Sequence, residues 1–90
     1  MKRSIILSLV FILLAFQASA YKQEDLDKLK STNDCFDCDL TGADLSEFNL
    51  KNTMLNFANL HGANLWGVDL ENAQIRGANL GGANLFQANF

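Results

Sequence analysis

A period of five residues runs without interruption through the C-terminal part of this 90-residue chain. From Cys38 onward it reads CDLTG, ADLSE, FNLKN, TMLNF, ANLHG, ANLWG, VDLEN, AQIRG, ANLGG, ANLFQ and ANF. The third place is large and apolar in all eleven units, and Asp or Asn precedes it in nine of them. Chance does not hold such a register over 53 residues, so an internal repeat governs the fold.

Neither a regular helix nor a continuous strand can use a period of five. Five residues advance a helix by about 500°, so the leucines would spread around the cylinder, and in a strand each step of five changes the face. A chain that turns a corner every five residues does bury every leucine. Residues that tolerate a positive φ fall two places after the apolar residue, as the third place of a type II turn requires: Gly42, Asn52, Gly62, Gly67, Asn72, Gly77 and Gly82.

Residues 38–90 resemble the pentapeptide-repeat family, whose motif is A-(D/N)-L-x-x, most clearly at ADLSE, ANLHG, ANLWG, ANLGG and ANLFQ. The resemblance implies an all-β fold, a right-handed quadrilateral β-helix with twenty residues per coil. Residues twenty apart then stack at about 4.8 Å. We expect inward columns of leucines, and polar ladders such as Asn59–Asn79 and Asn64–Asn84.

Residues 1–20 have the three parts of a secretory signal peptide. Lys2 and Arg3 precede the apolar run IILSLVFILLAF, and Ala18 and Ala20 form an A-x-A site before Tyr21. The sequence therefore predicts cleavage between Ala20 and Tyr21 and no stable membrane span afterwards. An uncleaved anchor is the alternative, but the run is short for about 30 Å of hydrocarbon. The expected location is the bacterial periplasm or the medium.

Both ends of the predicted β-helix need cover, because open coil ends expose backbone groups and core leucines. Residues 21–34 are expected to form an N-terminal capping helix and lead-in, with Leu26 and Leu29 on one face; a frayed linker is the alternative. The β-helix itself is assigned to residues 35–90. No comparable cap follows it in this sequence, so we expect either that the sequence is truncated at Phe90 or that the last coil pairs with another molecule, as in a homodimer.

Charge and motifs narrow the function classes. After removal of residues 1–20, five bases and ten acids give a net charge of minus five, which does not favour nucleic-acid binding. No catalytic constellation, metal-ligand set or cofactor motif is present, and the single histidine, His61, is expected to be exposed. We therefore predict a non-enzymatic protein without cofactor.

Outward aromatic residues are the candidate partner-binding face. Trp66 and Phe86 are twenty apart and are expected to stack with Ser46 beneath them, while Phe57 and Phe36 also fall at outward places. Exposed Trp and Phe are enriched where proteins meet partners. Stacked aromatic rings that merely cover the turns are the alternative. Lys51 and Glu71, also twenty apart, should form a weak surface pair.

Cys35 and Cys38 form a Cys-x-x-Cys pair at the start of the repeats. Counted in fives, Cys38 takes the small inward place and Cys35 the central place, so the pair spans one turn. Their Cα atoms should lie under about 7 Å apart, which permits a disulfide, and an exported protein meets an oxidising compartment. Two packed free thiols are the alternative. A thioredoxin-like enzyme lacks its βαβ context here, and a zinc site lacks two of four ligands.

These observations favour an exported protein-interaction or scaffold module with an unknown protein partner. The alternative function is binding or inhibition of a type II topoisomerase by DNA mimicry. It is implied by the resemblance, because characterised members of the family are acidic rods that mimic DNA and bind such an enzyme. The acidity agrees with that function, whereas the predicted signal peptide argues against it.

Overall fold

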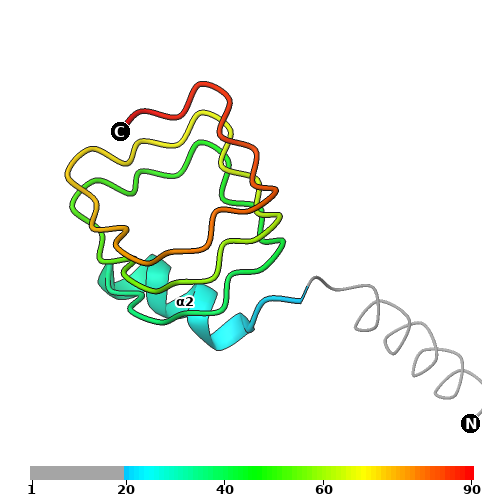
Figure 1. The fold of residues 1–90 in the computed structure, drawn as a ribbon. Coiled ribbons are helices and arrows are strands. Elements are labelled where there is room, and N and C mark those ends of the chain that lie inside the picture. The colour runs from blue at the N-terminus through cyan, green and yellow to red at the C-terminus, as the bar shows by residue number, and fades with distance from the viewer. Residues whose placement is uncertain (1–19) are drawn as a thin grey trace, which may run out of the picture.

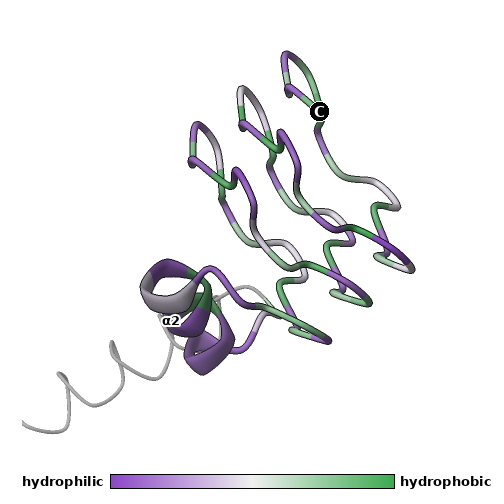
Figure 2. Ribbon diagram, turned by 90° about the vertical axis from the view of Figure 1, so that its left-hand side faces the viewer, coloured by the Kyte–Doolittle hydropathy of each residue, from purple (hydrophilic) through white to green (hydrophobic). Residues whose placement is uncertain are grey.

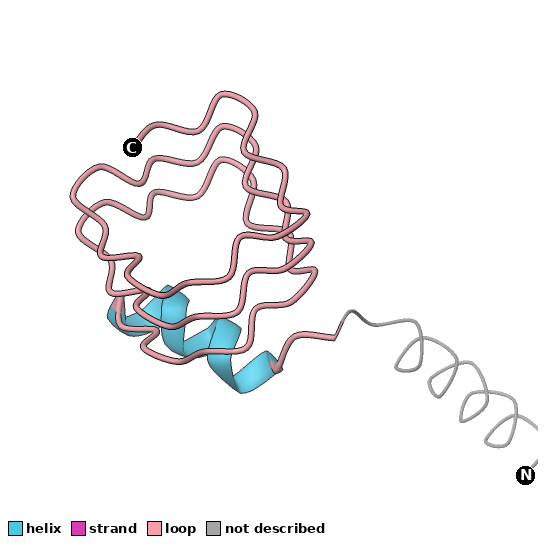
Figure 3. Ribbon diagram, in the orientation of Figure 1, coloured by secondary structure: helices cyan, strands magenta, loops and turns pink. Residues whose placement is uncertain are grey.

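The computed structural model describes residues 20–90, so the predicted signal peptide lies, except for Ala20, outside the described residues. Two parts follow each other along the chain (Figure 1): helix α2, Gln23–Thr32, and a coil that winds to Phe90. The coil consists of turns and single bridged residues. Figure 3 accordingly draws this part of the chain as loop, without strand arrows. Within residues 20–90, no helix has the length and apolar character that a membrane crossing needs.

The coil repeats every twenty residues. Eight parallel bridges join residues twenty apart, from Asp34–Met54 to Asp69–Asn89. Backbone hydrogen bonds accompany them; the Leu40 amide, for example, donates to the Asn59 carbonyl over 2.8 Å. Four turns fit into each coil, so only one residue per side is left to pair. That geometry explains why the described coil has isolated bridges where the all-β expectation suggested strands.

Every five-residue unit ends in the same turn. The amide three residues after each central residue donates back to that residue's carbonyl, as from Ala43 to Leu40 over 3.0 Å. The third place of all eleven turns has a positive φ, between 59° and 71°. Type II turns require this value there, so the expected turn chemistry is confirmed.

The core is a stack of leucines with small residues beside them. In the first two coils the central side chains are buried almost completely; Leu40, Leu60 and Leu65 expose 1 % or less. In the last described coil, Ile75, Leu80 and Leu85 are only partly buried. The last described coil has a neighbouring coil on one side only, and its central residues are the less buried ones.

Helix α2 covers the start of the first coil, at the end opposite Phe90 (Figure 2). Leu26 and Leu29 are buried against the coil, and Asn33 ends the helix in a left-handed conformation with φ 56°. Across the junction, the Lys22 amide donates to the Asp39 carbonyl over 3.1 Å, and the Asp39 amide donates to the Asp25 carboxylate over 2.8 Å. Lys22 and Asp25 therefore supply hydrogen-bond partners to Asp39 where a preceding coil would otherwise supply them.

Candidate protein-binding surface

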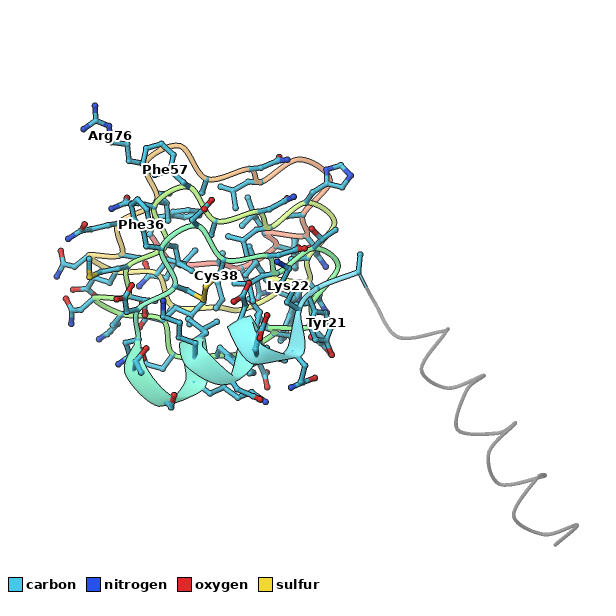
Figure 4. The ribbon with its side chains drawn as sticks, turned by 90° about the horizontal axis from the view of Figure 1, so that it is seen from below. Tyr21, Lys22, Phe36, Cys38, Phe57 and Arg76 are labelled. Carbon is cyan, nitrogen blue, oxygen red and sulfur yellow. A yellow bond between two sulfur atoms is a disulfide. The ribbon has the colours of Figure 1, made fainter. Side chains whose placement is uncertain are left out.

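Two phenylalanine rings contact each other on one corner of the coil. The rings of Phe36 and Phe57 meet edge to face with centroids 5.5 Å apart, and each side chain is 52 % exposed. A Cβ added at Gly77 would lie 2.6 Å from the Phe57 ring, so the ring uses the space that this glycine leaves. We call Phe36, Phe57 and Gly77 the aromatic corner. Figure 4 shows both rings and Arg76 following one another along the same edge.

Phe57 occupies a backbone position that a phenylalanine does not favour. Its φ is 62°, whereas the same place in other turns holds mostly Gly or Asn, residues suited to a positive φ. Left-handed backbone costs a bulky residue on the order of 1–2 kcal/mol. The ring is 52 % exposed, so only about half of its surface gains from burial.

The expected stack of Trp66 and Phe86 is not formed. They do lie on adjacent coils on one side, where the Gly67 amide donates to the Phe86 carbonyl over 2.9 Å, but Phe36–Phe57 is the only ring pair within residues 20–90. Their side chains are 36 % and 65 % exposed. Four turns per coil place Phe57 diagonally opposite this Trp66–Phe86 corner. The residues predicted as one face therefore lie on two corners.

In most turns, the backbone amide just after the central residue donates to the side-chain oxygen of the Asp or Asn just before that residue. Asn59 and Asn64 accept hydrogen bonds from the His61 and Trp66 amides over 3.0 and 3.1 Å. These oxygens bond within their own turns, and no side-chain hydrogen bond of the predicted Asn59–Asn79 and Asn64–Asn84 ladders forms in residues 20–90, where the backbone bridges alone join these pairs. One cross-coil amide–carboxylate bond does exist, from Asn89 to Asp69 over 3.2 Å.

Two of these carboxylates carry lowered pKa values. The hydroxyl of Thr41 donates to Asp39 and that of Ser46 to Asp44, each over 2.7 Å, and the backbone amide of the same residue donates as well. Both bonds favour the ionised form and hold each pKa below its ordinary value of 3.8. For Asp39, Lys22 adds a smaller electrostatic contribution in the same direction.

We expect the double variant Asp39→Asn/Asp44→Asn to lose less unfolding free energy than the wild type when the pH is lowered. With a folded-state pKa below the unfolded one, each carboxylate stabilises the fold above about pH 4, and this contribution is lost as pH falls through the lowered pKa. Asn keeps the oxygen acceptor, as Asn59 and Asn64 show. Denaturant midpoints measured from pH 6 to pH 2 test this, with Thr41→Val/Ser46→Ala expected to act in the same direction. A loss as large as that of the wild type in both variants would contradict the assignment.

Cys35 and Cys38 are joined by a disulfide within the first turn, with Cα atoms 5.1 Å apart. Both residues are buried, and the Cys35 sulfur lies 3.3 Å from the Asp25 carbonyl oxygen of α2. The disulfide therefore lies next to α2, and the loop that it closes carries Phe36 at the aromatic corner.

We expect the purified protein to take up no thiol label when unfolded without reductant and two labels after reduction. Closing so short a loop should stabilise the fold by about 2 kcal/mol, because the unfolded chain loses freedom. Mass spectrometry after alkylation reads the count, and Cys35→Ala/Cys38→Ala gives the stability difference. Two labels on unreduced, unfolded protein would show two thiols.

Charge is distributed unevenly along the coil. Residues 34–53 carry five acids and one lysine, a net charge of minus four, whereas residues 72–90 carry Arg76 and no acid. The predicted pair of Lys51 and Glu71 is present at 3.7 Å, and Asp69 lies equally near the same ammonium group. His61 is exposed, as expected.

Comparison with known proteins agrees with this architecture. The profile of pentapeptide repeats matches residues 34–65 and 55–90, with eight copies. The chain belongs to the pentapeptide-repeat family. Members of this family form β-helices and are generally non-enzymatic structural or binding proteins.

Three proteins to which this pentapeptide-repeat protein is similar come from Synechocystis, Nostoc and Cyanothece. The uncharacterized protein slr0516 of Synechocystis sp. is 47% identical over 57 residues, which are 61% of this chain and 34% of that protein, so the match spans about a third of the relative. The crystal structure of alr5209, a pentapeptide repeat protein from Nostoc, has 30% identity and a TM-score of 0.36, covering 72% and 71% of the two chains. Rfr23 from Cyanothece has 22% identity and a TM-score of 0.20, covering 74% and 90%.

Proposed function

We propose that this pentapeptide-repeat protein is an exported, non-enzymatic module that binds another protein through its outward aromatic side chains. The observation that carries the proposal is the set of large apolar side chains outside a coil whose interior is already filled by leucines. Aromatic side chains that lie together on a surface are typical of sites where a protein partner binds. They are Phe36, Met54, Phe57, Trp66 and Phe86.

The finer description of the coil that we propose is a right-handed quadrilateral β-helix, with residues 21–34 as its cap and residues 35–90 as its body. Four turns in twenty residues and parallel bridges at that spacing support this description. The location of α2 beside the first coil supports its role as a cap.

A capture experiment compares the aromatic corner with the Trp66–Phe86 corner. Tagged protein, exported from cells that express the full chain, is cross-linked in the native extract together with Trp66→Ala/Phe86→Ala and Phe36→Ala/Phe57→Ala. The proposal expects a partner that the wild type recovers and at least one double variant loses. Equal recovery by all three proteins would end the proposal that these aromatic residues bind a partner.

Export is part of the proposal and has its own test. The three-part pattern of residues 1–20 supports cleavage between Ala20 and Tyr21. N-terminal mass analysis of protein from the periplasm or medium should begin at Tyr21. A retained Met1 in a membrane fraction would instead indicate an anchor.

A homodimer through the last coil is a further part of the proposal. Phe90 is 61 % exposed there, and Leu80 and Leu85 are less buried than the leucines beneath them. Light scattering of the purified full chain tests it. A monomer at all concentrations measured would remove this contact.

The alternative, a DNA-mimicking binder of a type II topoisomerase, is less well supported by the charge distribution. DNA presents phosphates along its whole length, whereas residues 72–90 of this chain carry no acid. We expect no inhibition in a gyrase supercoiling assay with the purified protein. Inhibition at stoichiometric concentrations would reverse the choice.

A further inference from the structure

We infer that the aromatic corner docks a protein segment in which an apolar or aromatic side chain stands beside an arginine or lysine. This inference rests on the proposed binding function and adds the chemistry of the partner. It begins with Phe57, the only large apolar residue among the positive-φ positions of residues 20–90. Strain in the backbone that displays an exposed ring is a reason to seek a function for that ring.

The two rings of the aromatic corner are held in place by contacts within this chain alone. Phe36 is held within the Cys35–Cys38 loop, and its ring meets Phe57 edge to face. Phe57 in turn lies against Gly77, which provides room for it. A surface whose rings are already fixed loses little conformational entropy on binding.

Charge selects the kind of segment that fits. Asp37, the exposed neighbour of Phe36 in the disulfide loop, and Asp34 just before the loop place negative charge beside the rings. A cation beside an aromatic face is attracted by the ring as well as by these carboxylates. Arg76 lies next to Phe57, whose amide donates to the Arg76 carbonyl over 2.8 Å, and its side chain points away from the body of the coil (Figure 4).

A second copy of this chain is the less suitable occupant. After removal of residues 1–20 each copy carries a net charge of minus five, so two acidic coils would repel each other at this corner. A basic segment meets no such cost. Self-association through Phe57 is therefore one outcome that would overturn the inference.

The test uses three short capped peptides that differ only in two central residues: Phe-Arg, Phe-Glu and Ala-Arg. Protein from expression of the full chain is titrated while backbone amide shifts are followed by nuclear magnetic resonance. We expect Phe-Arg to shift the amides of Phe36, Asp37 and Phe57, and to bind about threefold or more tightly than either other peptide. Equal affinities, or shifts centred on Trp66, would overturn the inference.

Matched variants distinguish a loss of peptide binding at the aromatic corner from damage to the coil itself. Phe57→Asn places at this turn the residue found at Asn52 and Asn72, so the coil should persist while Phe-Arg binding is lost. Gly77→Asn should displace the Phe57 ring without removing it. Gly62→Asn is its control, since Gly62 has a similar φ of 68° and nothing within 4 Å of an added Cβ. Undiminished binding by Phe57→Asn, or equal effects of the two glycine variants, would contradict the assignment.

Sedimentation of the protein without peptide completes the test. A dimer that Phe57→Asn dissolves would identify a second copy as the occupant and overturn the inferred partner chemistry. If the peptides fail while the capture experiment still recovers a partner through an aromatic corner, only this inference fails. If capture fails too, the proposed binding function fails with it.

Discussion

Leu60→Ala should lower the free energy of unfolding by about 2–5 kcal/mol, the usual cost of emptying a leucine site in a packed core. Leu60 is 1 % exposed because it lies in the middle coil, between Leu40 below and Leu80 above. Each side of the coil contributes only one layer of side chains to the interior. Few neighbouring side chains can therefore move into the cavity that Leu60→Ala would leave. Denaturant unfolding, with the unfolding slope compared as well, measures the loss.

The matched control is Leu80→Ala in the same column. Leu80 is only partly buried, so its truncation removes less apolar contact and should cost clearly less. This comparison holds residue type and turn position constant and changes only the number of covering coils. Equal losses at the two sites would mean that stacking of neighbouring coils does not determine the stability of a unit.

Asp25→Ala should lower the free energy of unfolding by about 1.5–3 kcal/mol, the range for hydrogen bonds to charged groups. The Asp25 carboxylate accepts the Asp39 amide over 2.8 Å at the junction between α2 and the first coil. Without it that amide has no comparable acceptor in the cap. Thermal and denaturant unfolding measure the change.

Two further variants distinguish this contact from a general helix effect. Asp25→Asn keeps an oxygen acceptor and should recover part of the loss. Glu24→Ala removes the other acid of the first helical turn, which no docking bond engages in the described part of the chain, and should cost only a few tenths of a kcal/mol. If Glu24→Ala costs as much as Asp25→Ala, the docking bond is not the source of the stability.

The coil could be predicted from the sequence because its period constrains every unit in the same way. A leucine every five residues and turn-compatible residues two places later leave few arrangements that bury the leucines. The helix over Leu26 and Leu29 followed from their spacing and from the need to cover the first coil. Its docking through Asp25 did not, because an acid in a first helical turn has an ordinary explanation in the helix dipole.

The side-chain partners on the outside were predicted less well. Counting by twenty paired Trp66 with Phe86, yet the rings that meet are Phe36 and Phe57, which are twenty-one apart. Only the second of the two outward turn positions has a positive φ, so the two positions direct their side chains differently. The repeat therefore gives the corner on which a side chain stands but not the neighbour it touches. A signal was available in Phe57 itself, the residue least suited to its place in the turn.

The twenty-residue coil with four equivalent sides also determines how such a chain can change its length during evolution. Inserting one five-residue unit after residue 50 would leave every leucine inside and every turn intact. It would also rotate all later corners by a quarter of a revolution, so Phe57 would no longer stand above Phe36. Inserting four units would restore the corners and separate the two rings by a whole coil. Duplication of units can therefore rearrange the outer surface while the interior stays the same.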